Sequence, residues 1–372
     1  MQNFNKLLII RFSSFGDVTQ CLSVPSAIKS KYPYCEIHWV TRNEFLPLIE
    51  THPAVNSVWG LNKNDGLRGL LNLIYNLKKQ NFTHIYDAHN NLRSFLICFY
   101  LTLNFRFVWN LIFSSFFITK PLIIRRSIRR TKRFLLFNFR INLFQQPFSG
   151  QRDLLEPLFP WGILNSLPPP PQVFFSKENL NQFKIKFAKK MKLNLDSNVS
   201  LELSKYITLA ASSAHELKKW PKDYWIKLIS LLHDQKFILL GGPEDFFLKE
   251  IENSFPDRVF NFAGTLNLSE SGILLSYSKL LVSNDTGLLH IAEQLGHPCI
   301  ALMGPAPFGF PSRIQTTKIL ERNLKCRPCS KHGQGPCVNK NFQDCLRSIL
   351  PEEVCIEIKK ILLQNHNQNL EF

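Results

Sequence analysis

The fold is decided near the N-terminus by residues 7–17, which read Leu-Leu-Ile-Ile-Arg-Phe-Ser-Ser-Phe-Gly-Asp. The apolar run Leu7–Phe12 is typical of a buried strand, and the turn that ends it is followed by apolar residues at helical spacing up to Lys31. Further strands are predicted at 36–40, 55–61 and 83–87, with a helix at 67–79. Because strands alternate with helices of this length, we predict βαβ units and a parallel sheet.

The second half of the chain repeats the alternation. Strands are predicted at 206–211, 237–240, 259–262, 279–283 and 299–303, and helices at 222–235 and 244–254, with a third that reaches Leu295. Four consecutive prolines, Pro168–Pro171, form a stiff spacer between the halves. We therefore predict two doubly wound α/β domains, at 1–164 and 174–350, joined by a Pro-rich linker at 165–173 and followed by a C-terminal helix and tail at 351–372.

The composition limits the class of protein. The chain has 372 residues, 45 % of them apolar and 20 % charged, which excludes a disordered or collagen-like polymer. Nine cysteines form an odd set, and the four apolar residues after Lys6 are too few for a signal peptide, so we expect a reducing cytoplasm. The net charge of +17 predicts an anionic partner: nucleic acid, an anionic membrane or a phosphorylated substrate.

The basic charge is concentrated in one segment. Ala88–Arg152 holds 11 Lys and Arg and no Asp or Glu. Within it, residues 94–124 are apolar and rich in Phe, and the polybasic run Arg125–Arg133 follows. Arg106 divides the apolar run into pieces shorter than the roughly 20 residues of a membrane-spanning helix. The pattern favours a segment at about 94–140 that lies on an anionic leaflet; a buried helix with a solvated basic face and a true membrane span are the alternatives.

Two motifs lie where a predicted strand meets a helix. Asp17 follows the first strand in a turn that contains Gly16, where it could accept a proton from a hydroxyl; the alternative is a helix N-cap. Residues 284–290 read Asn-Asp-Thr-Gly-Leu-Leu-His, and the N–H groups of a helix start favour a phosphate. For these the alternative is an ordinary cap with a surface His.

Three further motifs carry polar or thiol side chains. Lys218 could neutralise charge on a departing diphosphate, or be a solvated surface Lys. A carboxylate of Gly241-Gly242-Pro243-Glu244-Asp245 could pair with ribose hydroxyls, or begin a helix. Cysteines stand at 326, 329, 337 and 345. They could form a structural metal site, a redox-labile pair or plain reduced thiols, and seven residues separate the second pair rather than the two common in zinc sites.

In their order along the chain, these motifs resemble those of the ADP-heptose:lipopolysaccharide heptosyltransferases, glycosyltransferase family 9. The resemblance extends from about residue 5 to about residue 350, and it is carried by Ser13–Val18, Asp87–Ser94, Lys218–Pro221, Gly241–Glu244 and Ser283–His290. It implies the GT-B fold, in which two Rossmann-like doubly wound α/β domains face a cleft. It also implies an inverting transfer of heptose from ADP-heptose to a sugar hydroxyl of the lipopolysaccharide inner core, on the lipid A–Kdo side, with no metal and no cofactor beyond the donor substrate.

The resemblance also assigns residues by position. Asp17 would be the general base, and Lys218, or else Lys219, would contact the diphosphate. The donor would be held by Ser14, Gly16, Ser212, Ser213, Glu244 or Asp245, Asp285, Thr286, Gly287 and His290. The acceptor, a phosphorylated glycolipid, would lie against Asn90, Arg93, Arg125, Arg126, Arg129 and Arg130, which implies a peripheral place on the cytoplasmic face of the inner membrane.

The chain departs from the family after Gly304-Pro305, where Ala306-Pro307-Phe308-Gly309-Phe310 stands and family members often carry Thr. The donor sugar is therefore left open, as are the core position and the oligomeric state. Three competing hypotheses remain: a GT-B transferase that uses another nucleotide sugar for a cell-envelope glycan, a membrane-surface scaffold without activity, and a nucleic-acid-binding protein. The last would need an RNP-type motif or a Cys/His finger, and the sequence has neither.

Overall fold

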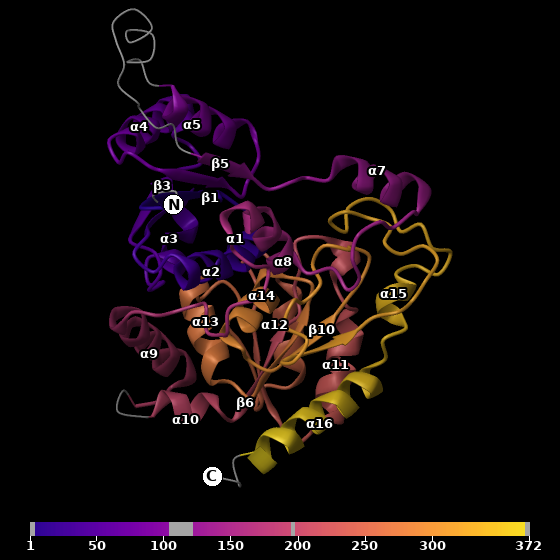
Figure 1. Ribbon diagram of the computed structural model, residues 1–372. Coiled ribbons are helices and arrows are strands. Elements are labelled where there is room, and N and C mark those ends of the chain that lie inside the picture. The colour runs from indigo at the N-terminus through magenta and orange to yellow at the C-terminus, as the bar shows by residue number, and fades with distance from the viewer. Residues whose placement is uncertain (1–3, 104–121, 195–197, 369–372) are drawn as a thin grey trace, which may run out of the picture. The chain divides into compact units, whose positions relative to one another are not determined.

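The computed structural model describes residues 4–103, 122–194 and 198–368. The chain forms two compact units, one made of Met1–Arg129 and Gln151–Phe174 and the other of Arg130–Gly150 and Phe175–Phe372. A parallel β-sheet with helices packed on it forms each unit (Figure 1). The predicted α/β architecture with two parallel sheets is confirmed. The division assigns residues 130–150 to the second unit, so the chain passes between the units three times.

The first unit has a five-stranded sheet in the order β3-β2-β1-β4-β5, and every pair is parallel. Leu8, Ile10 and Ile85 lie in one hydrophobic cluster with residues of α4 and α5. Central strands buried on both faces need continuous apolar runs, which explains the sequence of β1. The strands are β1 (Lys6–Ile10), β2 (Glu36–Arg42), β3 (Ser57–Leu61), β4 (His84–Asp87) and β5 (Leu122–Arg125).

Short helices complete the first unit. The single helix predicted after Asp17 is in fact two, because Pro25 has no N–H to bond the carbonyl of Cys21. The segment that follows the prolines is bonded to this unit, since Thr51 donates its hydroxyl to the Phe174 carbonyl at 2.6 Å. The helices are α1 (Phe15–Cys21), α2 (Ser23–Lys31), α3 (Leu46–Ile49), α4 (Gly66–Lys78), α5 (Leu92–Thr102) and α8 (Gly150–Leu155), with 3-10 turns at Asn43–Phe45 and Glu156–Trp161.

The second unit has a six-stranded parallel sheet in the order β11-β10-β9-β6-β7-β8. Five of its strands were predicted, and β11 was not. The strands are β6 (Tyr206–Ala210), β7 (Lys236–Leu239), β8 (Val259–Asn261), β9 (Leu280–Asn284), β10 (Cys299–Leu302) and β11 (Thr317–Leu320). The helices are α7 (Arg130–Phe139), α9 (Lys177–Met191), α10 (Val199–Leu203), α11 (Lys222–Leu231), α12 (Phe247–Ser254), α13 (Leu268–Tyr277), α14 (Gly287–Leu295), α15 (Asp344–Arg347) and α16 (Pro351–Gln368).

The C-terminal helix is part of the core of the second unit. Val354 and Ile358 of α16 are fully buried in one cluster with Trp225 of α11, and Figure 1 shows the two helices side by side. The indole N–H of Trp220 donates to the Ile349 carbonyl at 2.9 Å, just before α16 begins. Burial of each large apolar side chain stabilises the fold by about 1.5–3 kcal/mol, so α16 contributes to the stability of this sheet.

The predicted membrane-facing segment at about 94–140 is described in part. Its first residues lie in α5 and its last in β5 and α7, whereas residues 104–121 lie outside the described residues. Among the residues that the structure describes, no helix combines the length and apolarity needed to cross a membrane.

Candidate functional site

In the first unit the candidate base Asp17 is the third residue of α1, beyond the carboxyl end of β1. Ser14, the N-cap, donates to Asp17 Oδ2 through its hydroxyl at 2.9 Å and through its backbone N–H at 3.3 Å. The alternative that Asp17 is itself the N-cap is therefore wrong, although its carboxylate does help to cap the helix. The side chain is 40 % exposed, so its carboxylate is accessible to a substrate.

Two guanidinium groups surround the Asp17 carboxylate. Arg11 Nη2 lies 2.6 Å from Oδ2, and Arg126 Nη1 lies 3.8 Å from Oδ1. Arg11 is buried, and its Nη1 donates to the Ala88 carbonyl at 2.6 Å, which fixes its position. Burial raises the pKa of Asp17, but the two guanidinium groups and the hydrogen bonds from Ser14 outweigh it and hold the pKa at about 2. Asp17 is therefore ionised at neutral pH and ready to accept a hydrogen bond from a hydroxyl.

The arginines assigned to the acceptor are partly neutralised. Arg126 donates to Asp153 Oδ2 through Nε at 2.8 Å and is also paired with it through Nη2 at 2.7 Å. Arg129 Nη2 lies 3.5 Å from Asp153 Oδ1 and is bonded to Glu156. Asp153 and Glu156 both follow the acid-free segment, which ends at Arg152. The positive charge of Arg126 and Arg129 is therefore balanced by carboxylates that lie just after that segment in the sequence.

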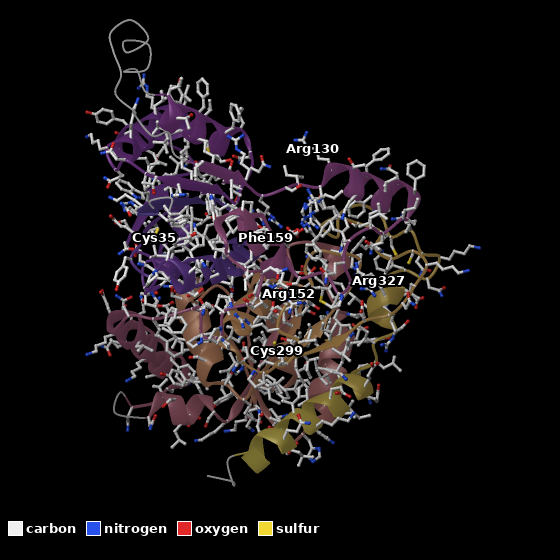
Figure 2. The ribbon with its side chains drawn as sticks, in the orientation of Figure 1. Cys35, Arg130, Arg152, Phe159, Cys299 and Arg327 are labelled. Carbon is white, nitrogen blue, oxygen red and sulfur yellow. The ribbon has the colours of Figure 1, made fainter. Side chains whose placement is uncertain are left out.

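The other acceptor candidates are more scattered. The side-chain amide of Asn90 donates to the Arg126 carbonyl at 2.7 Å, which ties it to the same region. Arg125 Nε lies 3.5 Å from Asp87 Oδ2, and Arg93 is exposed on α5. Arg130, labelled in Figure 2, begins α7 and belongs to the second unit, whereas the other acceptor candidates belong to the first.

In the second unit Lys218 lies beside the start of α14. Its Nζ is 2.7 Å from Asp285 Oδ2, and the two side chains are only 15 % and 7 % exposed. Lys219 is instead paired with the exposed Glu216 at 3.0 Å. The structure thus distinguishes the two lysines that the sequence left open: Lys218 is held at the phosphate-binding candidate, where Thr286 is the N-cap of α14 and Gly287 its first residue.

A positioning residue that the sequence did not single out is Asn284, which is fully buried. Its Nδ2 donates to the Ala211 carbonyl at 2.7 Å and to the Ser212 carbonyl at 3.4 Å. Its Oδ1 accepts the backbone N–H of Trp220 at 3.1 Å. One amide therefore joins the Ser/Ala-rich loop, which carries the half-buried Ser212 and Ser213, to the lysine motif and to the start of α14.

His290 is buried and does not lie on the surface as the alternative had it. Its Nδ1 lies 2.8 Å from Oε2 of Glu293, a fully buried carboxylate one turn along α14. The other oxygen of Glu293 accepts the backbone N–H groups of Ser312 and Arg313. Glu293 thus orients His290 and also fixes the loop at Ser312 and Arg313. In the sequence, the one sign of this role is that Glu293 stands three residues after His290.

The two ribose candidates lie in different surroundings. Asp245 is buried, and its Oδ2 accepts the Gly242 N–H at 2.7 Å, so it closes its own turn. Glu244 is exposed beside it. This turn also delays the helix expected from Glu244, since α12 begins only at Phe247. Of the two carboxylates, Glu244 is the one that a ribose could reach.

The loop that departs from the family anchors the basic helix α7. Phe308 lies edge-on to Phe137, Phe144 and Phe148, with ring centroids 5.1–6.2 Å apart. The Arg133 guanidinium lies over the Phe308 ring at 4.6 Å. The next residue must be glycine, because a Cβ on Gly309 would lie 2.0 Å from Asp285 Oδ1. Phe308, the centre of the aromatic cluster, is therefore the neighbour in sequence of Gly309, whose backbone lies against the Asp285 side chain.

The four C-terminal cysteines do lie together. Cys326, Cys329, Cys337 and Cys345 line one pocket, and burial raises the pKa of Cys345 to about 11. Within the described part of the chain, no group of three or more His, Cys, Asp or Glu side chains is placed to hold a metal ion.

Comparison with known proteins finds relatives in one glycosyltransferase family. Residues 164–341 match the family model of glycosyltransferase family 9 (heptosyltransferase). The chain is 25 % identical to lipopolysaccharide heptosyltransferase 1 of Campylobacter coli over 335 residues, which cover 86 % of this chain and 90 % of that protein. A solved family 9 glycosyl transferase from Veillonella parvula matches with a TM-score of 0.71 at 16 % identity, covering 98 % and 99 % of the two chains. ADP-heptose lipopolysaccharide heptosyltransferase II from E. coli matches with a TM-score of 0.65 at 19 % identity, covering 97 % and 99 %.

The fold is similar to that of GT-B heptosyltransferases, and the family match shows that the chain is a glycosyltransferase. The chain carries a family 9 domain over residues 164–341, and the resemblance that its motifs indicated is confirmed.

The pKa of Asp17 makes a prediction about stability. Because that pKa is lowered from 3.8 to about 2, the ionised carboxylate stabilises the folded state above pH 3.8, and this stabilisation is lost as the pH falls towards 2. The difference in urea-unfolding midpoint between the native protein and Asp17→Asn should be constant above about pH 5 and shrink below about pH 4. A difference that does not change with pH would contradict the pairing with Arg11.

The aromatic cluster makes a second prediction. Phe308→Ala should release α7 from the second unit, because the cavity and the lost ring contacts favour local opening. Hydrogen exchange of amides in 130–150 should become about tenfold faster or more. Phe159→Ala is the matched control, because Phe159, labelled in Figure 2, is 71 % exposed in the first unit. Equal exchange in both variants would show that Phe308 does not anchor the helix.

Proposed function

We propose that the protein transfers a heptose from ADP-heptose to a sugar hydroxyl of the lipopolysaccharide inner core, on the lipid A–Kdo side, with inversion and without a metal ion. The observation that carries the proposal is the 2.7 Å pair of Lys218 and Asp285 at the start of α14, inside the segment that matches the heptosyltransferase model. The C. coli and E. coli proteins named above are lipopolysaccharide heptosyltransferases, and the E. coli protein carries ADP-heptose in its name.

Donor binding would use the polar residues of the second unit. Lys218 would face the diphosphate, with the N–H groups at the start of α14 and the hydroxyl of Thr286. Glu244 would hold the ribose because its carboxylate is exposed, while the buried Asp245 keeps the turn closed. Asp285 holds the ammonium of Lys218 in place before the donor arrives, which reduces the entropy cost of ordering it.

The proposed reaction is one displacement. The acceptor oxygen bonds to the anomeric carbon while the bond from that carbon to the diphosphate oxygen breaks, and ADP leaves. Asp17 takes the proton of the acceptor hydroxyl, and Lys218 compensates the charge that grows on the diphosphate. Because the pKa of Asp17 is about 2, the proton moves only as the forming bond makes the hydroxyl acidic, and not beforehand.

The acceptor in this proposal is a phosphorylated glycolipid. Arg93 and Arg125 are exposed and would meet its anionic groups, while Arg126 and Arg129 are held by Asp153 and would shape the site around Asp17. Since such an acceptor is anchored in a bilayer, the protein would act on the cytoplasmic face of the inner membrane, bound peripherally. Nucleic acid has no part in the reaction.

Donor selectivity tests the proposal. Titration of the metal-free protein with ADP-heptose, UDP-GlcNAc and GDP-mannose should give the tightest binding for ADP-heptose. Lys218→Ala should weaken that binding about tenfold or more, because a charge-assisted contact is lost, and the matched Lys219→Ala should leave it unchanged. Preference for another nucleotide would overturn the donor, and equal loss in both lysine variants would overturn the role of Lys218. The Phe308-Gly309 loop, which differs from the family, makes another sugar on the donor the second candidate.

Asp17→Asn tests the base. Transfer to the acceptor should fall by about 10²–10⁴-fold, because the amide cannot take the proton, while the dissociation constant for ADP-heptose should not change. Ser14→Ala is the milder control, since it removes one hydrogen bond to the carboxylate and leaves the carboxylate itself. Undiminished transfer by Asp17→Asn would remove Asp17 from the mechanism.

A further inference from the structure

An apolar surface covers the pair of helices α4 and α5 in the first unit. On α4, Leu67, Leu71 and Tyr75 follow one another at spacings of four residues and are 64 %, 44 % and 63 % exposed. The neighbouring helix α5 exposes Leu92, Phe95, Phe99 and Tyr100. The two helices pack against each other and lie side by side in Figure 1, so their exposed side chains form one surface, which we call the α4–α5 face.

The inner sides of the same helices are buried in the usual way. Leu70, Leu73, Ile74 and Leu77 of α4 lie in the core cluster with Ile97 of α5. The exposed apolar residues therefore form a second apolar face, in addition to the face that each helix packs into the core. Monomeric proteins rarely leave so many large apolar side chains together on the surface unless a partner covers them.

The charges on this face are almost all positive; the exception is the exposed Asp65 at the N-cap of α4, whose carboxylate accepts the Asn62 N–H at 3.1 Å. Arg68, Lys78, Lys79 and Arg93 are exposed on the two helices. Between Gly66 and Leu103 the sole carboxylate is Asp87, which is fully buried. Lys79 lies over the exposed ring of Tyr75 at 4.1 Å, and Arg125, at the end of the neighbouring strand β5, lies over the ring of Phe95 at 4.9 Å. Aromatic and aliphatic side chains among Lys and Arg match the headgroup region of an anionic bilayer, where apolar groups enter the acyl boundary and cations meet the phosphates.

We propose that the α4–α5 face docks the protein on a membrane rich in anionic phospholipid. The inference deepens the proposed function, which needs a membrane-anchored acceptor, and it names the surface: α4, which the sequence analysis left as an ordinary helix, together with α5. A second copy of the chain is disfavoured as the occupant, because two such faces would bring their cations together, with Asp65 at the N-terminal end of α4 as the one exposed carboxylate of each described face to pair them.

Co-sedimentation with vesicles tests the proposal on the full chain. The native protein should bind vesicles of phosphatidylcholine with about 30 % phosphatidylglycerol and not pure phosphatidylcholine, and about 0.5 M NaCl should weaken binding. Leu67→Ser/Tyr75→Ser/Phe99→Ser should lower the partition coefficient at least tenfold. The matched control is Leu201→Ser/Ile356→Ser/Leu363→Ser, which alters side chains of similar exposure in the second unit and should bind like the native protein.

Two outcomes would overturn the proposal. One is equal vesicle binding by the native protein and the α4–α5 variant. The other is a concentration-dependent dimer, seen by ultracentrifugation, that the α4–α5 variant abolishes while no protein binds vesicles. Titration of the same variant with ADP-heptose keeps the two proposals separate, because this variant should bind the donor normally. Vesicle binding without donor binding by the native protein would contradict the proposed function and leave the docking face intact.

Discussion

The side-chain amide of Asn284 is the contact on which the candidate site of the second unit depends. It sits in the interior, where a polar group must be bonded, and it bonds the ends of two other loops, through Ala211 and Trp220. Lys218 is two residues before Trp220, and Asp285 is the residue after Asn284. The short distance between Lys218 and Asp285 is therefore a consequence of the amide. An apolar residue at 284 would leave buried carbonyl and N–H groups without their partner, at a cost of about 1–3 kcal/mol each.

In the first unit, the buried guanidinium of Arg11 positions the candidate base Asp17. Arg11 is bonded to the Ala88 carbonyl and needs a carboxylate, because an unpaired guanidinium in the interior is costly. Asp17 supplies it, and Asp153 does the same for Arg126. The arrangement keeps Asp17 ionised but makes it a weak base. In the reaction proposed above, such a weak base would suit a step in which proton transfer accompanies bond formation.

The elements that the sequence predicted are those whose signal is local. Central parallel strands such as β1, β6 and β9 are apolar runs bounded by turns, and they were found within a few residues. The edge strands β5 and β11 were missed because both are partly exposed, the apolar start of β5 merges with the apolar run 94–124, and Lys318 interrupts β11. The motif residues were placed correctly at strand ends, since parallel strands bring those ends to one edge of a sheet. What could not be predicted depends on contacts distant in the chain: Asn284 with Trp220, Arg126 with Asp153, and α7 with the loop at Phe308.

The contact of α7 with Phe308 connects two unusual features of the sequence, the loop at 306–310 and the high Phe content. The loop after Gly304-Pro305, which departs from the pattern that the motif resemblance implies, carries Phe308, and the chain has 32 Phe in all. Phe137, Phe144 and Phe148 surround Phe308, so the changed loop and part of the Phe excess form one cluster, in which each ring needs the others to be shielded from water. The cluster fixes the loop through Gly309, which touches Asp285 and so reaches the partner of Lys218. The basic helix α7, which the sequence placed with the acceptor, is in consequence part of the unit that carries Lys218 and Asp285.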